Sequence, residues 1–174
     1  MKKNIAVIGC GHWGKNLVRN FSELGVLAAV CDPNEELAQS YAEKYGVDKL
    51  SFTAVTNNVA IKGVVLAVPA PLHASMAIEA MNAGKHVYVE KPLAMNRDEA
   101  EKMIASAKKN DVQLMVGHLL QYHPVFAAVR GLVESGELGV LNYIYSNRMS
   151  FGKVRSEEDV IWSFAPHDIS MILS

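Results

Sequence analysis

The sequence predicts an α/β fold with a doubly wound parallel sheet, followed by the start of an α+β domain with an open sheet. Two observations lead to this prediction. Short apolar runs and helical patterns alternate over the first two-thirds of the 174 residues, as in successive βαβ units. The first apolar run, residues 4–8, leads directly into a glycine-rich segment, GCGHWG at residues 9–14, as in a strand that turns into a helix.

The glycines of this segment have the spacing G-x-G-x-x-G, and each has its own task. Gly9 allows a tight turn out of the strand, Gly11 lets the backbone approach a pyrophosphate, and Gly14 lets the helix pack against the strand. The start of the helix presents free N–H groups to phosphate charge. A glycine-rich turn without a ligand is the alternative. Because an acid, Asp32, follows about 20 residues later, the arrangement favours a dinucleotide-binding site.

Asp32 ends the second apolar run, residues 26–31, and bears on which dinucleotide binds. A carboxylate at this position accepts hydrogen bonds from ribose hydroxyls and repels a 2′-phosphate. Residues 33–36 contain no lysine or arginine that would hold such a phosphate. The sequence therefore favours NAD over NADP. Asp32 is also placed to cap the helix expected from residue 35, and the two roles are compatible.

The other elements follow from periodicity and from glycine or asparagine at helix ends. Helices are expected over residues 13–24, 35–45, 71–83 and 96–109, and strands over residues 49–52, 63–68, 86–89 and 112–116. The pattern then changes to a helix over 124–134, a half-exposed strand through Leu141, Tyr143 and Tyr145, a polar loop over 152–159 and a helix opened by Pro166. This change predicts a dinucleotide-binding domain at 1–120 and part of a second domain at 121–174.

Composition and charge exclude several classes of protein. The net charge is −1, which argues against a nucleic-acid-binding surface. No apolar stretch approaches the ~20 residues needed to span a bilayer, and the N-terminus has no signal-peptide pattern. Cys10 and Cys31 end adjacent predicted strands, and we expect them as reduced thiols in a cytoplasmic protein.

Two further segments follow buried strands, at the edge where open α/β sheets bind ligands. In VPAPLH, residues 68–73, His73 is interpreted as either a ligand contact or a helix N-terminal residue. The turn Glu90-Lys91-Pro92 is either a surface turn with an ion pair or part of a site. In the second case Lys91 hydrogen-bonds a substrate oxygen, and Pro92 fixes the turn, for which a cis peptide is one means.

His167 and Asp168 lie in the last predicted helix. A histidine beside an acid is more often structural than catalytic, yet oxidation of an alcohol requires a proton acceptor that titrates near neutral pH. Lys91 and His167 come from different predicted domains and are expected to meet in the cleft between them. Metal chemistry is not expected, because the six histidines are scattered and no H-x-x-x-H, C-x-x-C or H-E-x-x-H spacing occurs.

Together these segments resemble the Gfo/Idh/MocA oxidoreductases. The resemblance extends over the whole chain and rests on the glycine loop, Asp32, VPAPLH, AGKHVYVEKPLA at residues 83–94 and SGELG at residues 135–139. Residues 117–124 and 163–168 are most similar to nucleotide-sugar 3-dehydrogenases, which act on UDP-N-acetylglucosamine or its uronic acid. The implied fold is a Rossmann fold, and the implied activity is NAD-dependent oxidation of a secondary hydroxyl of a sugar or nucleotide sugar to a ketone. An NAD-dependent glycosidase of the same fold and an impaired NAD-binding module are the alternatives.

The resemblance also implies roles for individual residues. Lys91 would position the reacting hydroxyl and assist proton transfer, and His167 would be the general acid/base. Glu90 would contact the cofactor or hold Lys91 in place. The residues implied in cofactor binding lie in the glycine loop and in the turns after the following strands: Gly9, Gly11, His12, Trp13, Gly14, Asp32, Pro69, His73, Glu90 and Lys91.

The sequence departs from the family pattern at two positions and in its length. Ser163 stands where many sugar and inositol dehydrogenases have an aspartate, and Gln121 stands where an arginine is frequent. Family members continue well past residue 174, so the chain is expected to be a truncated, N-terminal portion that binds NAD but turns over slowly or not at all. The full-length form is expected to be a homo-oligomer without a nucleic-acid or membrane partner.

Overall fold

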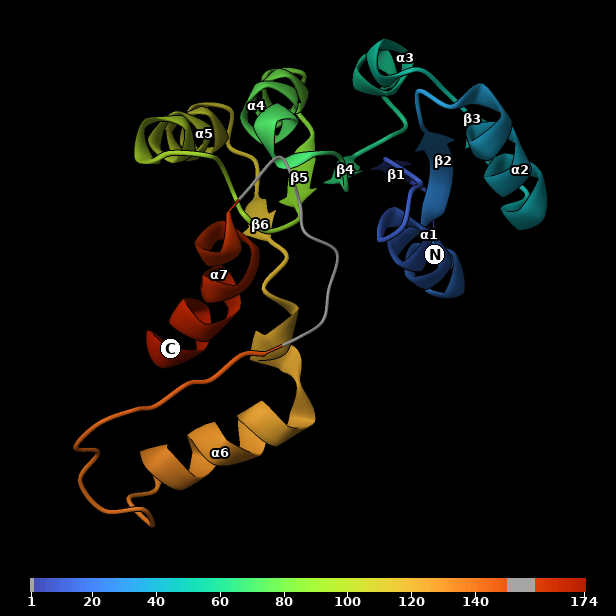
Figure 1. The fold of residues 1–174 in the computed structure, drawn as a ribbon. Coiled ribbons are helices and arrows are strands. Elements are labelled where there is room, and N and C mark those ends of the chain that lie inside the picture. The colour runs from blue at the N-terminus through green and yellow to red at the C-terminus, as the bar shows by residue number, and fades with distance from the viewer. Residues whose placement is uncertain (1, 150–158) are drawn as a thin grey trace. The chain divides into compact units, whose positions relative to one another are not determined.

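The structure, a computed structural model, describes residues 2–149 and 159–174 and divides into two compact units, Met1–Val116 and Gly117–Ser174 (Figure 1). The first unit contains a six-stranded sheet in the order β3-β2-β1-β4-β5-β6, in which every pairing is parallel. The strands are β1 (Ile5–Ile8), β2 (Leu27–Cys31), β3 (Asp48–Lys49), β4 (Gly63–Leu66), β5 (His86–Val89) and β6 (Leu114–Val116). The predicted Rossmann sheet is confirmed.

Helices cover both faces of this sheet. They are α1 (Gly14–Glu23), α2 (Glu35–Tyr45), α3 (Phe52–Asn57), α4 (His73–Asn82) and α5 (Arg97–Lys109), and a 3₁₀ helix, Ala70–Leu72, precedes α4. Successive residues of a strand point to opposite faces. Ile8 of β1 accordingly packs in one cluster with residues of α4 and α5, which lie side by side, whereas Val7 packs in a second cluster with residues of α1 and α2 (Figure 1).

Helix caps explain where these elements begin and end. The side chains of Asn34 and Asn96 accept hydrogen bonds from the backbone N–H groups of Leu37 and Glu99, so they cap α2 and α5. Asn96 was the predicted cap of α5. The cap of α2 is Asn34 instead of Asp32, which corrects the second role expected of Asp32. Gly46 ends α2 with a left-handed φ of 60°, a conformation that glycine adopts without steric cost.

The strand predicted over residues 49–52 forms as β3, but its predicted bounds are wrong. Strand β3 begins at Asp48 and ends at Lys49, and α3 begins three residues later. The hydroxyl of Ser51 accepts a hydrogen bond from the backbone N–H of Ala54 at 3.1 Å, which caps a helix within the residues predicted as a strand. Val55 of this helix is fully buried in the cluster that also contains Ile8.

The second unit contains a 3₁₀ helix, Leu119–Tyr122, and the helices α6 (Pro124–Glu134) and α7 (Val160–Ile172). Helix α6 matches its prediction, but the predicted strand through Tyr143 and Tyr145 does not form, because described residues 141–149 pair with no neighbouring strand. Pro166 was expected to open the last helix and lies inside it, since Asp159 caps α7 by accepting from the N–H of Trp162. Residues 152–158 of the predicted polar loop lie outside the described residues.

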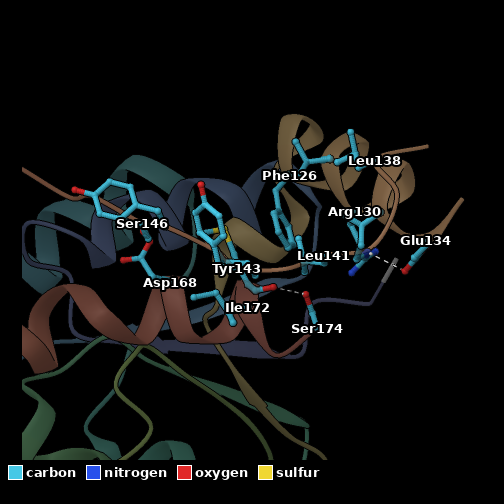
Figure 2. Close-up of a pocket in the computed structure, with 15 residues that line it drawn as sticks. Phe126, Arg130, Glu134, Leu138, Leu141, Tyr143, Ser146, Asp168, Ile172 and Ser174 are labelled. Atoms are coloured by element: carbon cyan, nitrogen blue, oxygen red, sulfur yellow. Dashed lines mark hydrogen bonds and ion pairs between the residues drawn. The ribbon is translucent and has the colours of Figure 1, made fainter. Parts of the chain in front are cut away.

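An open apolar groove of about 460 Å³ lies within the second unit (Figure 2). Its lining includes six apolar or aromatic side chains from α6, α7 and the segment between them: Phe126, Val129, Val133, Leu141, Tyr143 and Ile172. Figure 2 shows Ser146 with Asp168 on one side and Arg130 with Glu134 on the other. None of the site residues predicted from the sequence lines this groove.

None of the helices in the described part of the chain combines the length and apolar character needed to span a membrane.

Candidate functional site

The candidate site lies at the carboxyl edge of the sheet in the first unit. Strands β1, β2, β4 and β5 run parallel, so the turns that follow them lie at the same edge. This is the edge at which open α/β sheets bind ligands. The four turns begin at Gly9, Asp32, Ala67 and Glu90. The predicted site residues of the first unit therefore belong to one edge.

The glycine loop follows β1 and approaches the end of β4 closely. Gly9 has a φ of +90°, and a Cβ atom there would lie 2.5 Å from the carbonyl oxygen of Ala67. A Cβ atom at Gly14 would lie 1.9 Å from the carbonyl oxygen of Gly9. Gly11 differs, because no heavy atom lies within 4 Å of the position of its missing Cβ. Gly9 and Gly14 thus close the loop, and Gly11 leaves open space above it.

The start of α1 is suited to bind an anion. Among the hydrogen bonds of the described residues, the backbone N–H groups of Gly11, His12 and Trp13 donate to no protein acceptor. The first turn of α1 contains no acidic side chain that would compete for these groups. His12 is exposed, and Trp13 is 44% exposed. Free amides at a helix N-terminus, beside a glycine without a side chain, fit the diphosphate of a dinucleotide.

Asp32 lies directly beside this loop. Its Oδ2 accepts a hydrogen bond of 2.7 Å from the N–H of Cys10, and its Oδ1 accepts one of 2.9 Å from the N–H of Asn34. These two bonds fix the carboxylate at the end of β2. Because a carboxylate has about four lone-pair positions, Asp32 retains acceptor capacity for ribose hydroxyls.

The two cysteines near the loop are free and buried. Burial raises the pKa of the Cys10 thiol to about 12, and the negative charges of Asp32 and Cys31 add to this effect. Burial and the Asp32 charge also raise the pKa of Cys31. Since the thiolate is the reactive form, neither cysteine is suited to act as a nucleophile.

His73 begins α4 and is almost fully buried, with 1% of its surface exposed. Its Nδ1 lies 2.7 Å from the carbonyl oxygen of Pro92, and its Nε2 lies 2.9 Å from that of Val68. Both ring nitrogens thus engage backbone carbonyls. The structure places His73 at the start of α4, in agreement with one of its two interpretations. Pro69, in contrast, is exposed in the turn after β4.

Glu90 connects the glycine loop to the turn after β5. Its Oε1 accepts hydrogen bonds from Trp13 Nε1 at 2.8 Å and from the Tyr88 hydroxyl at 3.0 Å. Only 8% of the Glu90 surface is exposed. Lys91 follows and is half-buried, and the Lys91–Pro92 peptide is cis. The structure therefore brings Trp13, Glu90 and Lys91 together at this edge.

His167 lies half-buried on α7 of the second unit, whereas Lys91 belongs to the first unit. Next to His167, Asp168 accepts hydrogen bonds from Arg148 Nε at 2.9 Å and Nη2 at 3.0 Å. The Arg148 guanidinium holds the pKa of Asp168 below its usual value. Gln121 donates a hydrogen bond to the carbonyl oxygen of Ser170 within the same unit.

Two residues that contact the predicted site segments, Tyr88 and Arg148, were not identified from the sequence. Tyr88 lies two residues before Glu90, and the period of two in a strand places both side chains on the same face, which is a usable signal. Arg148 has no comparable local signal, because its partner Asp168 is 20 residues away. Within the described ranges, no group of three or more His, Cys, Asp or Glu residues is arranged to bind a metal ion.

The chain matches the Gfo/Idh/MocA family model, described as an oxidoreductase family with an NAD-binding Rossmann fold, over residues 3–118. It is 31% identical over 169 residues to the UDP-N-acetylglucosamine 3-dehydrogenase of Acidithiobacillus ferrooxidans, covering 96% of this chain and 52% of that protein. It is also 31% identical over 140 residues to the scyllo-inositol 2-dehydrogenase (NAD(+)) of Bacillus subtilis, covering 77% of this chain and 41% of that protein.

Among solved structures, a 3-ketoreductase from Actinomadura kijaniata in complex with NADP and TDP-benzene is similar with a TM-score of 0.72 and 26% identity. The match covers 78% of this chain and 43% of that one. The chain thus spans about half the length of the curated relatives that it matches. The family model covers well over half of the chain and coincides with the sheet and glycine loop described above. This protein is a member of the Gfo/Idh/MocA oxidoreductases and has their NAD-binding Rossmann fold.

Proposed function

We propose that this protein is an NAD-dependent oxidoreductase that oxidises a secondary hydroxyl of a sugar or nucleotide sugar to a ketone. The observation that carries the proposal is the hydrogen bond between Trp13 and Glu90, which joins a phosphate-binding loop to a turn that carries a lysine. A lysine at this edge is placed to act on a substrate beside the cofactor. The similarity to the UDP-N-acetylglucosamine 3-dehydrogenase supports the substrate class.

The proposed cofactor is NAD. When bound, it supplies the acceptor for the hydride ion that leaves the alcohol carbon. The backbone amides of Gly11, His12 and Trp13 bind the diphosphate, and the Asp32 carboxylate accepts hydrogen bonds from ribose hydroxyls and repels a 2′-phosphate. Gly9 and Gly14 act by shaping the loop, and Pro69, exposed beside it, contacts the cofactor.

The proposed catalytic residues are Lys91 and His167. The Lys91 ammonium donates a hydrogen bond to the reacting hydroxyl and thereby orients it and favours loss of its proton. A ring nitrogen of His167 accepts this proton as general base. Because Ser163 precedes His167 by one helical turn in place of the frequent aspartate, the proposed pair is a lysine and a histidine without that acid.

The two units have separate proposed roles. The N-terminal domain, residues 1–120, holds the cofactor, and residues 121–174 contribute His167 and part of the substrate site. In its full-length form we propose a homo-oligomer, which sedimentation equilibrium would measure. The proposed location is the cytoplasm, and the unbridged state of Cys10 and Cys31 supports it.

Single-turnover NADH formation tests the activity, because protein in excess over NAD reveals even slow chemistry. With UDP-N-acetylglucosamine we expect slow NADH formation by the natural chain. Lys91→Ala and His167→Ala are each expected to slow it by a factor of about 100 or more, with NAD affinity within about twofold. The control Lys108→Ala changes an exposed lysine at the end of α5 and is expected to react as the unchanged chain does.

Two outcomes would contradict the proposal. Release of nitrophenol from a p-nitrophenyl glycoside without net NADH would favour an NAD-dependent glycosidase. A chain that binds NAD but forms no NADH from any sugar, and whose rate of NADH formation is the same with Lys91→Ala, would favour a binding module.

A further inference from the structure

We infer that Trp13 and Tyr88 are positioning residues for Lys91, and that they act through the side chain of Glu90. The inference rests on the proposed function of Lys91 and goes beyond it by naming what holds the lysine. It starts from one carboxylate oxygen, Glu90 Oε1, which accepts both the 2.8 Å bond from the Trp13 indole and the 3.0 Å bond from the Tyr88 hydroxyl.

The two donors come from different elements. Tyr88 lies on β5, two residues before Glu90, while Trp13 lies 77 residues away at the N-cap position of α1. Hydrogen bonds are directional, so two of them from donors on different elements to one oxygen restrict the conformation of the Glu90 side chain. Glu90 is thereby fixed against the glycine loop and immediately precedes Lys91.

The other side of Lys91 is fixed as well. The carbonyl oxygen of Pro92 lies 2.7 Å from His73 Nδ1, and His73 Nε2 lies 2.9 Å from the carbonyl oxygen of Val68 at the end of β4. His73 is buried, so these contacts are shielded from competing water. The backbone of Lys91 is therefore held between two anchors, one on the loop after β1 and one on the turn after β4.

Trp13 is only partly buried. Its side chain is 44% exposed, whereas most large apolar side chains of the core are almost completely buried. What the indole provides is an N–H donor, beside the free amides proposed to bind the diphosphate. The hydrogen bond from the indole to Glu90 therefore connects the glycine loop to the residue that precedes Lys91.

The test observes Lys91 directly in the natural chain. Lysines are labelled by reductive methylation with ¹³C-formaldehyde, and Lys91→Arg identifies the Lys91 resonance in a ¹H–¹³C spectrum. The variants are Trp13→Phe and Tyr88→Phe, which each remove one donor, together with Glu90→Ala and Glu90→Gln. The matched controls are Trp162→Phe and Tyr41→Phe, which change an aromatic residue elsewhere. Circular dichroism confirms that each variant is folded.

We expect Trp13→Phe, Tyr88→Phe and Glu90→Ala to shift the Lys91 resonance toward that of free dimethyl-lysine. Glu90→Gln retains an oxygen that accepts both bonds, so it is expected to stay close to the unchanged chain. The two controls are expected to leave the resonance unchanged. An unchanged Lys91 resonance in folded Trp13→Phe and Glu90→Ala would overturn the inference, as would an equal shift in Glu90→Gln and Glu90→Ala.

The spectra are recorded without cofactor, so the result does not depend on the proposed function. A calorimetric titration with NAD is run beside them on the unchanged chain. If NAD fails to bind, the proposed function fails, and the Lys91 resonances still decide the positioning role. If NAD binds and the resonances do not respond, only the positioning role fails.

Discussion

Gly9 and Gly25 share a positive φ but differ in their surroundings. Gly9 has a φ of +90°, and a Cβ atom there would overlap the backbone at Ala67. Gly25 follows α1 with a φ of +72°, and no heavy atom lies within 4 Å of its missing Cβ. An alanine at Gly25 would therefore show the cost of backbone strain alone. An alanine at Gly9, in the candidate site, would show the same strain together with steric overlap.

Gly25→Ala is expected to lower the free energy of unfolding by about 1–2 kcal/mol, the cost of a left-handed conformation for a residue with a side chain. Gly9→Ala adds the overlap with Ala67 and is expected to lower it by roughly 1–3 kcal/mol more. Urea denaturation measures both. Equal losses in the two variants would contradict the close approach of the glycine loop to β4.

The cysteines give a second prediction at this scale. Because burial raises the pKa of Cys10 to about 12 and also raises that of Cys31, both thiols are expected to stay protonated at about pH 8. Iodoacetamide should then label neither in the folded protein and both in urea, as followed by mass spectrometry. Labelling of Cys10 at the same rate in both states would show that the structure misplaces it.

At the scale of elements, one ion pair holds the segment before residue 150 to α7. Arg148 donates two hydrogen bonds to Asp168, and both side chains are mostly shielded, with 32% and 18% exposed. The guanidinium lowers the pKa of Asp168 in the folded state. A carboxyl whose pKa is lowered by folding stabilises the fold above its unfolded pKa, and this contribution is lost as the pH falls through the folded value.

Arg148→Met is therefore expected to lower the free energy of unfolding by about 1–2 kcal/mol near neutral pH. The difference should shrink below roughly pH 4 and vanish once Asp168 is protonated in both states. Arg97→Met is the control, because Arg97 forms an exposed pair with Glu101 on α5 and is expected to change little. A loss for Arg148→Met that is independent of pH would contradict this account.

The elements also show what the sequence could predict. The starts of α2 at residue 35 and of α5 after Asn96 and the turn at Gly46 depend on neighbouring residues, so local patterns were sufficient for these boundaries, although the cap of α2 was misassigned to Asp32. Helix α3 was missed because it is short and its cap, Ser51, lies within the residues that were predicted as a strand. The strand expected near Tyr143 requires a partner strand to pair with, which a periodic pattern cannot supply.

In the candidate site too, features set by neighbouring residues were predictable, whereas contacts between distant residues were not. Glycine spacing and the acid at Asp32 are local signals, and parallel strands bring their turns to one edge, so the residues that share this edge were predictable. The bond between Trp13 and Glu90 joins residues 77 positions apart, and no spacing rule encodes it. For His73 the sequence left two interpretations, because its burial and its contacts with the carbonyl oxygens of Pro92 and Val68 depend on the folded chain.

At the scale of the whole chain, the proposed cofactor residues all belong to the unit Met1–Val116, whereas His167 belongs to Gly117–Ser174. The family model matches nearly the same segment as the first unit, residues 3–118. The separate roles proposed for the two units follow from this distribution of residues. Cofactor binding is assigned to the first unit, and the proposed reaction uses residues of both.

The measurement that tests the central claim most directly is a calorimetric titration of the chain with NAD and with NADP. The free amides beside Gly11 and the fixed carboxylate of Asp32 predict heat of binding with NAD, and binding of NADP weaker by about tenfold or more. Absence of heat with both dinucleotides, or tighter binding of NADP, would contradict the account.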